Sequence, residues 1–85
     1  MTQLQYETMF SEQNGRCAIC KKAHKSKRAM HIDHDHKTKK IRGLLCWFCN
    51  TGLARFRDNP EFLRAAIEYL LEPPCRIQEA FPGAR

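Results

Sequence analysis

The stretch from His31 to Asn50 holds most of the side chains that could do chemistry in this sequence. It opens with three histidines and two aspartates in the six residues HIDHDH, continues through a basic segment, and ends in a CxxC motif followed at once by Asn50. A neutral imidazole can take a proton from water near pH 7, and carboxylate or amide oxygens suit a hard divalent cation. Hydrolysis of a phosphodiester needs such a base and such a cation, which is the chemistry these residue types indicate.

Two CxxC motifs indicate a metal site of a different kind. Cys17 and Cys20 form the first pair, Cys46 and Cys49 form the second, and twenty-five residues separate them. This spacing predicts a structural Cys₄ zinc site, with a gap long enough to hold structure of its own. Cys75 lies beyond a Pro-Pro pair and is expected to be a free thiol.

Length and composition favour one small domain that needs a metal site to stabilise it. Eighty-five residues bury too little apolar surface to be comfortably stable unaided. The sequence shows no signal peptide and no apolar run that could span a bilayer, and its five cysteines are an odd number. We therefore expect a protein of a reducing cytoplasm with no membrane partner.

The basic residues cluster around the histidine-rich stretch. Between Arg16 and Arg42 the sequence has ten basic residues and only two acidic ones, whereas the net charge of the whole chain is +6. This block indicates a polyanionic partner, and the alternative is a solvated basic face without function.

The apolar pattern and the turn residues predict the elements that must position these groups. Asn14-Gly15 should stop an N-terminal helix, and Asp58-Asn59-Pro60-Glu61 should start a C-terminal one. We expect helices over residues 3–13, 45–56 and from 60 to the Pro73-Pro74 pair, strands over 29–32 and 41–44, a turn over 37–40, and a loose tail over 73–85. In this arrangement the middle helix would hold Cys46, Cys49 and Asn50 together.

Asp33 and His34 pose a geometric problem because they are adjacent. Side chains of neighbouring strand residues point to opposite faces, so both can serve one site only if the strand bends or bulges there. Strand, turn, strand and helix, with a polar cluster leaving the first strand, is the layout of a ββα-metal nuclease site.

The motifs DHDH, RGLLC and CxxCN, with GRCAIC upstream and DNPEFLRAAIEYL downstream, resemble the recombination endonuclease VII family of bacteriophages, within the HNH or ββα-metal nucleases. The resemblance covers about residues 6–72. It implies an α+β, zinc-stapled ββα-metal (HNH, His-Me finger) fold with an N-terminal and a C-terminal helix. It also implies a nuclease domain over residues 1–72, in the host cytoplasm if a phage encodes it.

The resemblance also implies a role for each matching position. Asp33 and Asn50 would hold a catalytic Mg²⁺ or Mn²⁺, His34 would be the general base, and His36 would touch the scissile phosphate or orient a neighbour. The four cysteines would bind the structural zinc, and His31 also matches a family histidine. We expect the DNA backbone to contact the basic side chains Arg28, Lys37, Lys39, Lys40 and Arg42.

Several of these residues have a second interpretation. The histidines could bind a structural ion, although we expect no zinc on residues 31–36, and Asn50 could cap a backbone group. Asp35 is expected either to orient an imidazole or to be a turn residue. Trp47 could stack on nucleic acid, but an aromatic beside a zinc knuckle is more often part of a core. The whole chain could also be a catalytically silent zinc module that binds DNA or a host protein, or a purely structural zinc ribbon.

Two features depart from the family pattern. Lys39 stands where family members often have a turn glycine, which predicts a wider hairpin with an extra positive charge. The sequence also ends soon after the DNPEF helix, whereas family members that resolve branched DNA have a longer helical extension through which two subunits intertwine. We therefore expect a monomer rather than an intertwined dimer, and a nicking or weakly specific DNA endonuclease.

Overall fold

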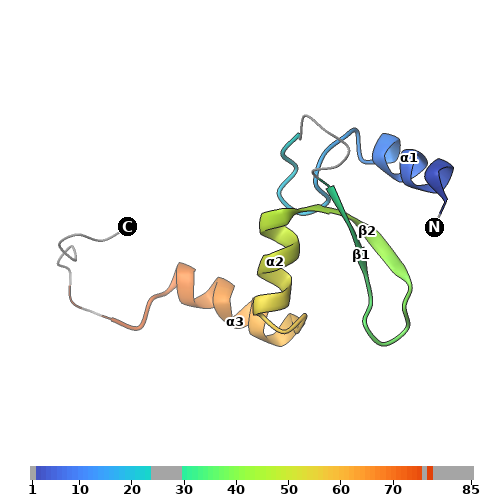
Figure 1. The fold of residues 1–85 in the computed structure, drawn as a ribbon. Helices are drawn as coiled ribbons and strands as arrows, with labels where there is room; N and C mark the ends of the chain where they lie inside the picture. The colour runs from blue at the N-terminus through green and yellow to red at the C-terminus, as the bar shows by residue number, and fades with distance from the viewer. Residues whose placement is uncertain (1, 24–29, 76, 78–85) are drawn as a thin grey trace.

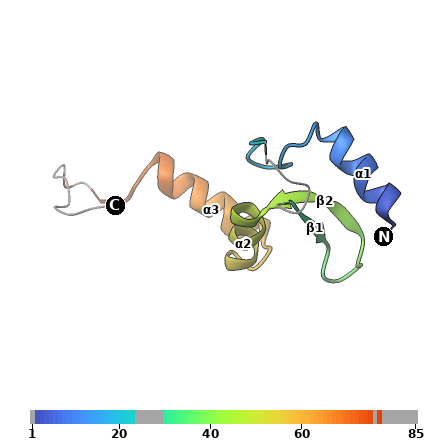
Figure 2. The same cartoon turned by 45° about the horizontal axis from the view of Figure 1, so that its top comes forward.

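The computed structural model describes residues 2–23, 30–75 and 77. Its elements follow the order α1 (Gln3–Glu12), β1 (Met30–His34), β2 (Ile41–Cys46), α2 (Trp47–Arg55) and α3 (Pro60–Leu71) (Figure 1). Helix α2 lies beside the β1–β2 hairpin, while α1 and α3 lie on opposite sides of this unit in both views (Figures 1 and 2). The predicted α+β class and the predicted order of elements are confirmed.

Helix α1 begins and ends as its sequence predicts. The Thr2 hydroxyl accepts from the Gln5 backbone N–H, and the Gln5 side chain accepts from the Thr2 backbone, which makes a reciprocal capping box. Asn14 and Gly15 both have positive φ, at 55° and 67°, and end the helix. The Tyr6 hydroxyl donates to the Met30 carbonyl at 3.3 Å, so α1 is tied to the start of β1.

The hairpin is antiparallel, and a glutamine side chain pairs with its second strand. Met30 lies opposite Cys46 and Asp33 lies opposite Gly43. The Gln13 amide extends this pairing, because its Oε1 accepts from the Leu44 N–H at 2.9 Å and its Nε2 donates to the Leu44 carbonyl at 3.0 Å. Gln13 thereby satisfies backbone groups of a fully buried residue, a role that no sequence pattern indicated.

The strands extend further than predicted, and α2 starts later. Cys46 is the last residue of β2 and the N-cap of α2, so the prediction that the helix includes Leu45 and Cys46 is wrong. The physical reason is the backbone pairing between β1 and β2, in which Leu45 lies opposite His31. The residues from Gly43 to Cys46 are also all buried. Asp33 and His34 likewise belong to β1.

The described core is small. Its buried apolar members are two thiols and a few aliphatic side chains from the hairpin, and parts of α1 and α2 pack against them. The buried residues are Cys17, Met30, Leu44, Leu45 and Cys46. So few aliphatic side chains stabilise a fold only weakly, which agrees with the need for a staple.

Helix α3 starts as predicted but buries little of its apolar stripe. The Asn59 side chain accepts from the Glu61 N–H at 2.8 Å, and Pro60 occupies the first turn. Leu70 and Leu71 are each 75% exposed, because α3 extends away from the hairpin (Figures 1 and 2). Residues 73–75 and 77 of the predicted tail form neither helix nor strand, and its other residues lie outside the described part.

Candidate active site and metal cluster

The two CxxC motifs meet in one cluster. The four sulfur atoms of Cys17, Cys20, Cys46 and Cys49 all lie within 4.8 Å of one another, and Cys20 Sγ is 3.9 Å from Cys46 Sγ. A tetrahedral zinc with Zn–S bonds of about 2.3 Å needs sulfur atoms about 3.8 Å apart. The donor set and its spacing therefore fit a structural zinc ion, as the sequence spacing predicted.

The environments of these thiols differ. Burial, the largest influence on Cys17, raises its pKa, but backbone N–H groups around the sulfur, that of Cys46 first, outweigh burial and lower the pKa to about 6. One of these donors is the Ile19 N–H, which lies 3.4 Å from the Cys17 sulfur. Burial raises the pKa of Cys49 to about 12. Cys17 is therefore the readier of these two to supply a thiolate to a metal.

The pairing of the two strands is irregular at Asp33 and His34. Asp33 pairs with Gly43 but His34 pairs with Ile41, so Arg42 is an extra residue on β2. Such a bulge bends the strand and re-aims its side chains. Asp33 and His34 both line one pocket beside this irregularity, which lies at the position where their adjacency predicted a bend or bulge.

This pocket also receives Asn50 from helix α2. It has a volume of about 300 Å³ and is lined on the hairpin side by Asp33, His34 and His36 and on the helix side by Asn50 and Thr51. The junction of β2 and α2, where Cys46 and Cys49 join the thiol cluster, places Asn50 in the first turn of α2. The structure thus brings together the four residues predicted for the catalytic site.

The three histidines of β1 and its turn have different positions. The rings of His34 and His36 lie 5.1 Å apart, centroid to centroid, and are tilted by 57°. His31 is exposed and pairs with Leu45 near the other end of the strand. Among the described residues that line the pocket, His34 and His36 are the histidines.

Asp33 forms an ion pair with Arg42, a residue predicted from the sequence to contact DNA. It is buried, and its carboxylate accepts from Arg42 Nε at 2.7 Å and from Arg42 Nη2 at 3.1 Å. The same guanidinium donates from Nη1 and Nη2 to Asp58 at 3.0 and 2.9 Å. Arg42, predicted as a phosphate contact, therefore bridges two carboxylates here, and Asp58 is a site residue that the sequence indicated only as a helix cap.

This bridge affects the titration of its members. The hydrogen bonds that Arg42 donates to Asp33, and then those to Asp58, raise the pKa of Arg42 above its usual range. The hydrogen bonds from Arg42 lower the pKa of Asp58. Arg42 and Asp58 are therefore both charged at neutral pH.

The hairpin turn contains the predicted basic residues. Asp35 is a turn residue, as one of its two interpretations proposed: its Oδ1 accepts from the backbone N–H groups of Thr38 and Lys37, which lower its pKa. Lys39 has a φ of +66°, the conformation that favours the glycine it replaces. Lys37, Lys39 and Lys40 are exposed, and Arg28 lies outside the described residues.

Trp47 is not a core residue. Its side chain is 56% exposed and packs edge-on against Phe48, which is 78% exposed, at a centroid distance of 5.1 Å. The prediction that it belongs to a core is wrong because α2 starts at Trp47, so the first helical turn projects both rings outward.

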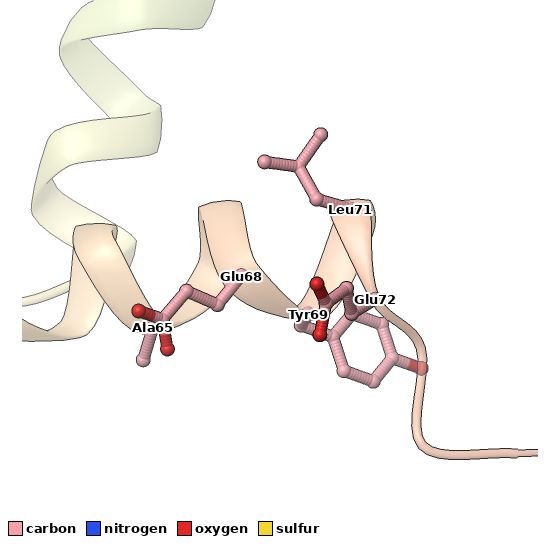
Figure 3. Close-up of a pocket in the computed structure, with 5 residues that line it drawn as sticks. All are labelled: Ala65, Glu68, Tyr69, Leu71 and Glu72. Carbon is pink, nitrogen blue, oxygen red and sulfur yellow. The ribbon is translucent and has the colours of Figure 1, made fainter.

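A larger hollow of about 540 Å³ lies along α3 (Figure 3). Its lining comes from one helix and the residue after it, namely Ala65, Glu68, Tyr69, Leu71 and Glu72. These side chains include carboxylates but no histidine, so this hollow does not combine an imidazole with oxygen ligands. The smaller pocket at the bulge is the candidate active site.

Comparison with known proteins agrees with this geometry. Residues 1–72 match the model of the family described as recombination endonuclease VII. The chain is 49% identical over 72 residues to the Gene 59 protein of Mycobacterium phage L5 and 43% identical over 76 residues to the Gene 59 protein of Mycobacterium phage D29. These matches cover 84% and 88% of this chain but 44% and 46% of the phage proteins, so the chain spans less than half the length of these curated relatives.

A solved structure extends the likeness to three dimensions. The crystal structure of the ββα-Me type II restriction endonuclease Hpy99I matches with a TM-score of 0.59 and 36% identity, over 79% of this chain and 40% of that one. No helix in the described part of the chain combines the length and apolar character needed to cross a membrane. The matched residues, the thiol cluster and the bulged hairpin beside α2 show that this chain belongs to the recombination endonuclease VII family and has the ββα-metal nuclease fold.

Proposed function

We propose that this chain is a metal-dependent DNA endonuclease that hydrolyses phosphodiester bonds, and that residues 1–72 form its nuclease domain. The observation that carries the proposal is the convergence of Asp33, His34 and Asn50 on one pocket, from strand β1 and from the first turn of helix α2. Family membership supports the same reaction class. A binding module would need no such combination of an imidazole with oxygen ligands.

In this proposal His34 is the general base. Its imidazole takes the proton from the attacking water, and the adjacent His36 contacts the scissile phosphate or orients His34 across the 5.1 Å between their rings. Asp33 and Asn50 offer a carboxylate and an amide oxygen, the donors that Mg²⁺ or Mn²⁺ prefers. When bound there, the cation would offset the negative charge that develops on the phosphate and the leaving oxygen.

The proposed partner is the DNA backbone. Lys37, Lys39 and Lys40 are exposed in and beside the hairpin turn. An open hollow of about 550 Å³ beside the pocket is lined by Lys37 and Arg57, together with the carboxylates of Asp35 and Asp58. Phosphate contacts of this kind position a duplex without reading its sequence. A chain with one such pocket would nick one strand at a time. Arg28 stays a predicted contact, and the monomeric state stays a prediction.

A plasmid-nicking assay tests the proposal. Zinc-loaded protein should convert supercoiled plasmid to open circles with Mg²⁺ or Mn²⁺ and not without added divalent cation. His34→Ala should lower the rate by about 10²- to 10⁴-fold, the usual contribution of a positioned base. His31→Ala is the matched control, since it removes an exposed histidine of the same strand that lies outside the pocket.

The alternative is a zinc module that binds DNA or a host protein without cleaving. It predicts DNA binding by the parent with no nicking in either cation. It also predicts that His34→Ala and His31→Ala behave alike in every assay, which would contradict the endonuclease proposal.

A further inference from the structure

The Arg42 guanidinium joins two parts of the molecule by direct hydrogen bonds, the β1–β2 hairpin and the turn that follows α2. It makes four hydrogen bonds of 2.7–3.1 Å, two to Asp33 on β1 and two to Asp58 after α2. A guanidinium has five N–H donors, so only one is left for another partner. Its fork geometry fixes both carboxylates in position as well as neutralising them.

The bulge makes this arrangement possible. Asp33 lies directly opposite Gly43, so in a regular strand the next residue, Arg42, would point to the other face. Because Arg42 is the extra residue of the bulge, its side chain can turn back towards Asp33. The irregularity beside Asp33 therefore supplies the partner of its buried carboxylate.

The second anchor is an unusual turn at the end of α2. Arg57 and Asp58 both have positive φ, at 57° and 55°, a conformation that non-glycine residues adopt only when the surroundings hold them. The Asp58 N–H donates to the Leu53 carbonyl of α2 at 2.8 Å, and its carboxylate faces Arg42. Asp58 is thus fixed to the same helix that carries Asn50 in its first turn.

The bridge also lies beside an apolar hollow. Asp33, Arg42 and Asp58 line one side of a hollow of about 290 Å³ whose other walls include Leu45, Leu53 and Leu63, from three different elements. The side chains of Asp33, Asp58 and Arg42 are 11%, 26% and 37% exposed, and this partial burial reduces the screening of their mutual attraction by water. The contacts should therefore hold β1 and α2 together more firmly than fully exposed pairs would.

We propose that Arg42 is a positioning residue: through Asp33 and Asp58 it sets the separation between the Asp33 carboxylate and the Asn50 amide. Each Asp33 oxygen keeps a lone pair beyond the one that Arg42 uses, so the carboxylate can still bind a cation. The inference rests on the proposed function, because that function gives the Asp33–Asn50 separation its purpose. It replaces a phosphate contact as the main role of Arg42.

Two substitutions distinguish positioning from charge. Arg42→Lys keeps the positive charge but cannot make the fork, and Asp58→Asn weakens the α2 anchor while leaving the Arg42–Asp33 pair intact. Arg64→Ala is the matched control, because it breaks an exposed arginine–carboxylate pair with Glu61, at 2.9 Å, away from the pocket. Zinc content and circular dichroism verify that each variant is folded.

The first readout needs no catalysis. Mn²⁺ binding to the zinc-loaded protein is followed by the electron paramagnetic resonance signal of free Mn²⁺, and Asp33→Asn identifies the part of the binding that belongs to this pocket. The second readout separates kcat from KM for plasmid nicking. We expect Arg42→Lys and Asp58→Asn to weaken Asp33-dependent Mn²⁺ binding at least threefold and to lower kcat at least tenfold, with KM for DNA within twofold of the parent. Arg64→Ala should match the parent in both readouts.

Two other outcomes overturn the inference in different ways. If Arg42→Lys and Asp58→Asn bind Mn²⁺ and turn over like the parent while Arg42→Gln raises KM for DNA and reduces its salt dependence, Arg42 is a phosphate contact. If the parent shows neither Asp33-dependent Mn²⁺ binding nor nicking, the proposed function fails, and the positioning role fails with it.

Discussion

The thiol cluster and the pocket at the bulge lie on either side of one strand-to-helix junction and differ in almost every property that matters to a metal. The cluster has four soft ligands within 4.8 Å of one another, and Cys17 and Cys46 among them are buried. The pocket is open, holds oxygen and imidazole donors, and keeps its carboxylate in an ion pair with Arg42. A closed tetrahedral set suits an ion that holds the fold, and an open hard set suits an exchangeable one.

The shared junction explains why the two sites can cooperate. Cys46 ends β2 and Cys49 lies in the first turn of α2, so an ion on the cluster fixes the direction in which α2 leaves the sheet. Asn50 follows Cys49 directly in the chain and is one of the residues that line the pocket. In the proposed function, an ion on the cluster would therefore orient Asn50, a ligand proposed for the other site, without belonging to that site.

Loss of the structural ion should have the largest effect. Because the described core has few aliphatic side chains, we expect Cys49→Ser or stripping of zinc to abolish cooperative thermal unfolding, since structural zinc contributes on the order of 10 kcal/mol in small domains. Circular dichroism melts and metal analysis measure this. Cys75→Ser, the control at the cysteine outside the cluster, should keep one zinc per chain and an unchanged melt.

Gln13→Ala should lower the stability of the fold, by less than the loss of zinc does. It leaves the Leu44 N–H without its 2.9 Å partner in a fully buried position, which should lower the free energy of unfolding by about 1–3 kcal/mol. Denaturant titration measures the loss. Gln3→Ala, which removes an exposed glutamine of α1, should change stability by less than about 0.5 kcal/mol. Equal effects of the two substitutions would mean that the Gln13 contacts with β2 are unimportant.

Lys39→Gly should have the smallest effect and the opposite sign. Lys39 has a φ of +66°, a left-handed conformation that costs a non-glycine residue about 1–2 kcal/mol. Glycine avoids this cost but loses more backbone entropy on folding, so the free energy of unfolding should rise by about 0.5–1 kcal/mol. Lys40→Gly, at the next position, should destabilise the protein instead, because Lys40 is not in that region. A loss of stability in both variants would show that the turn does not strain Lys39.

The sequence predicted most of what depends on local spacing. The two CxxC pairs predicted the cluster, the Asn59-Pro60 cap predicted the start of α3, and the adjacency of Asp33 and His34 required the bulge that the structure contains. These features can be predicted from sequence because each follows from a few neighbouring residues and a fixed geometry.

Features that depend on long-range contacts were missed or predicted wrongly. The helical spacing of Leu45 and Phe48 suggested a helix that includes Cys46, but pairing with β1 keeps residues 45 and 46 in the sheet. The Gln13 contact with Leu44 joins residues 31 positions apart, and the Arg42 contact with Asp58 joins residues 16 positions apart. No periodic pattern in the sequence indicates either contact. Local pattern cannot reveal which distant polar group will satisfy a buried one.

The most direct test of the central claim, that two metal sites do separate work, is a cation titration with zinc accounting. Zinc-loaded protein is freed of labile divalent ions by dialysis, and plasmid nicking is then measured against added Mn²⁺ while zinc per chain is quantified at every point. We predict no nicking before Mn²⁺ is added, saturable nicking afterwards, and one zinc per chain throughout. Nicking that needs no added cation and falls only as zinc is lost would contradict the account.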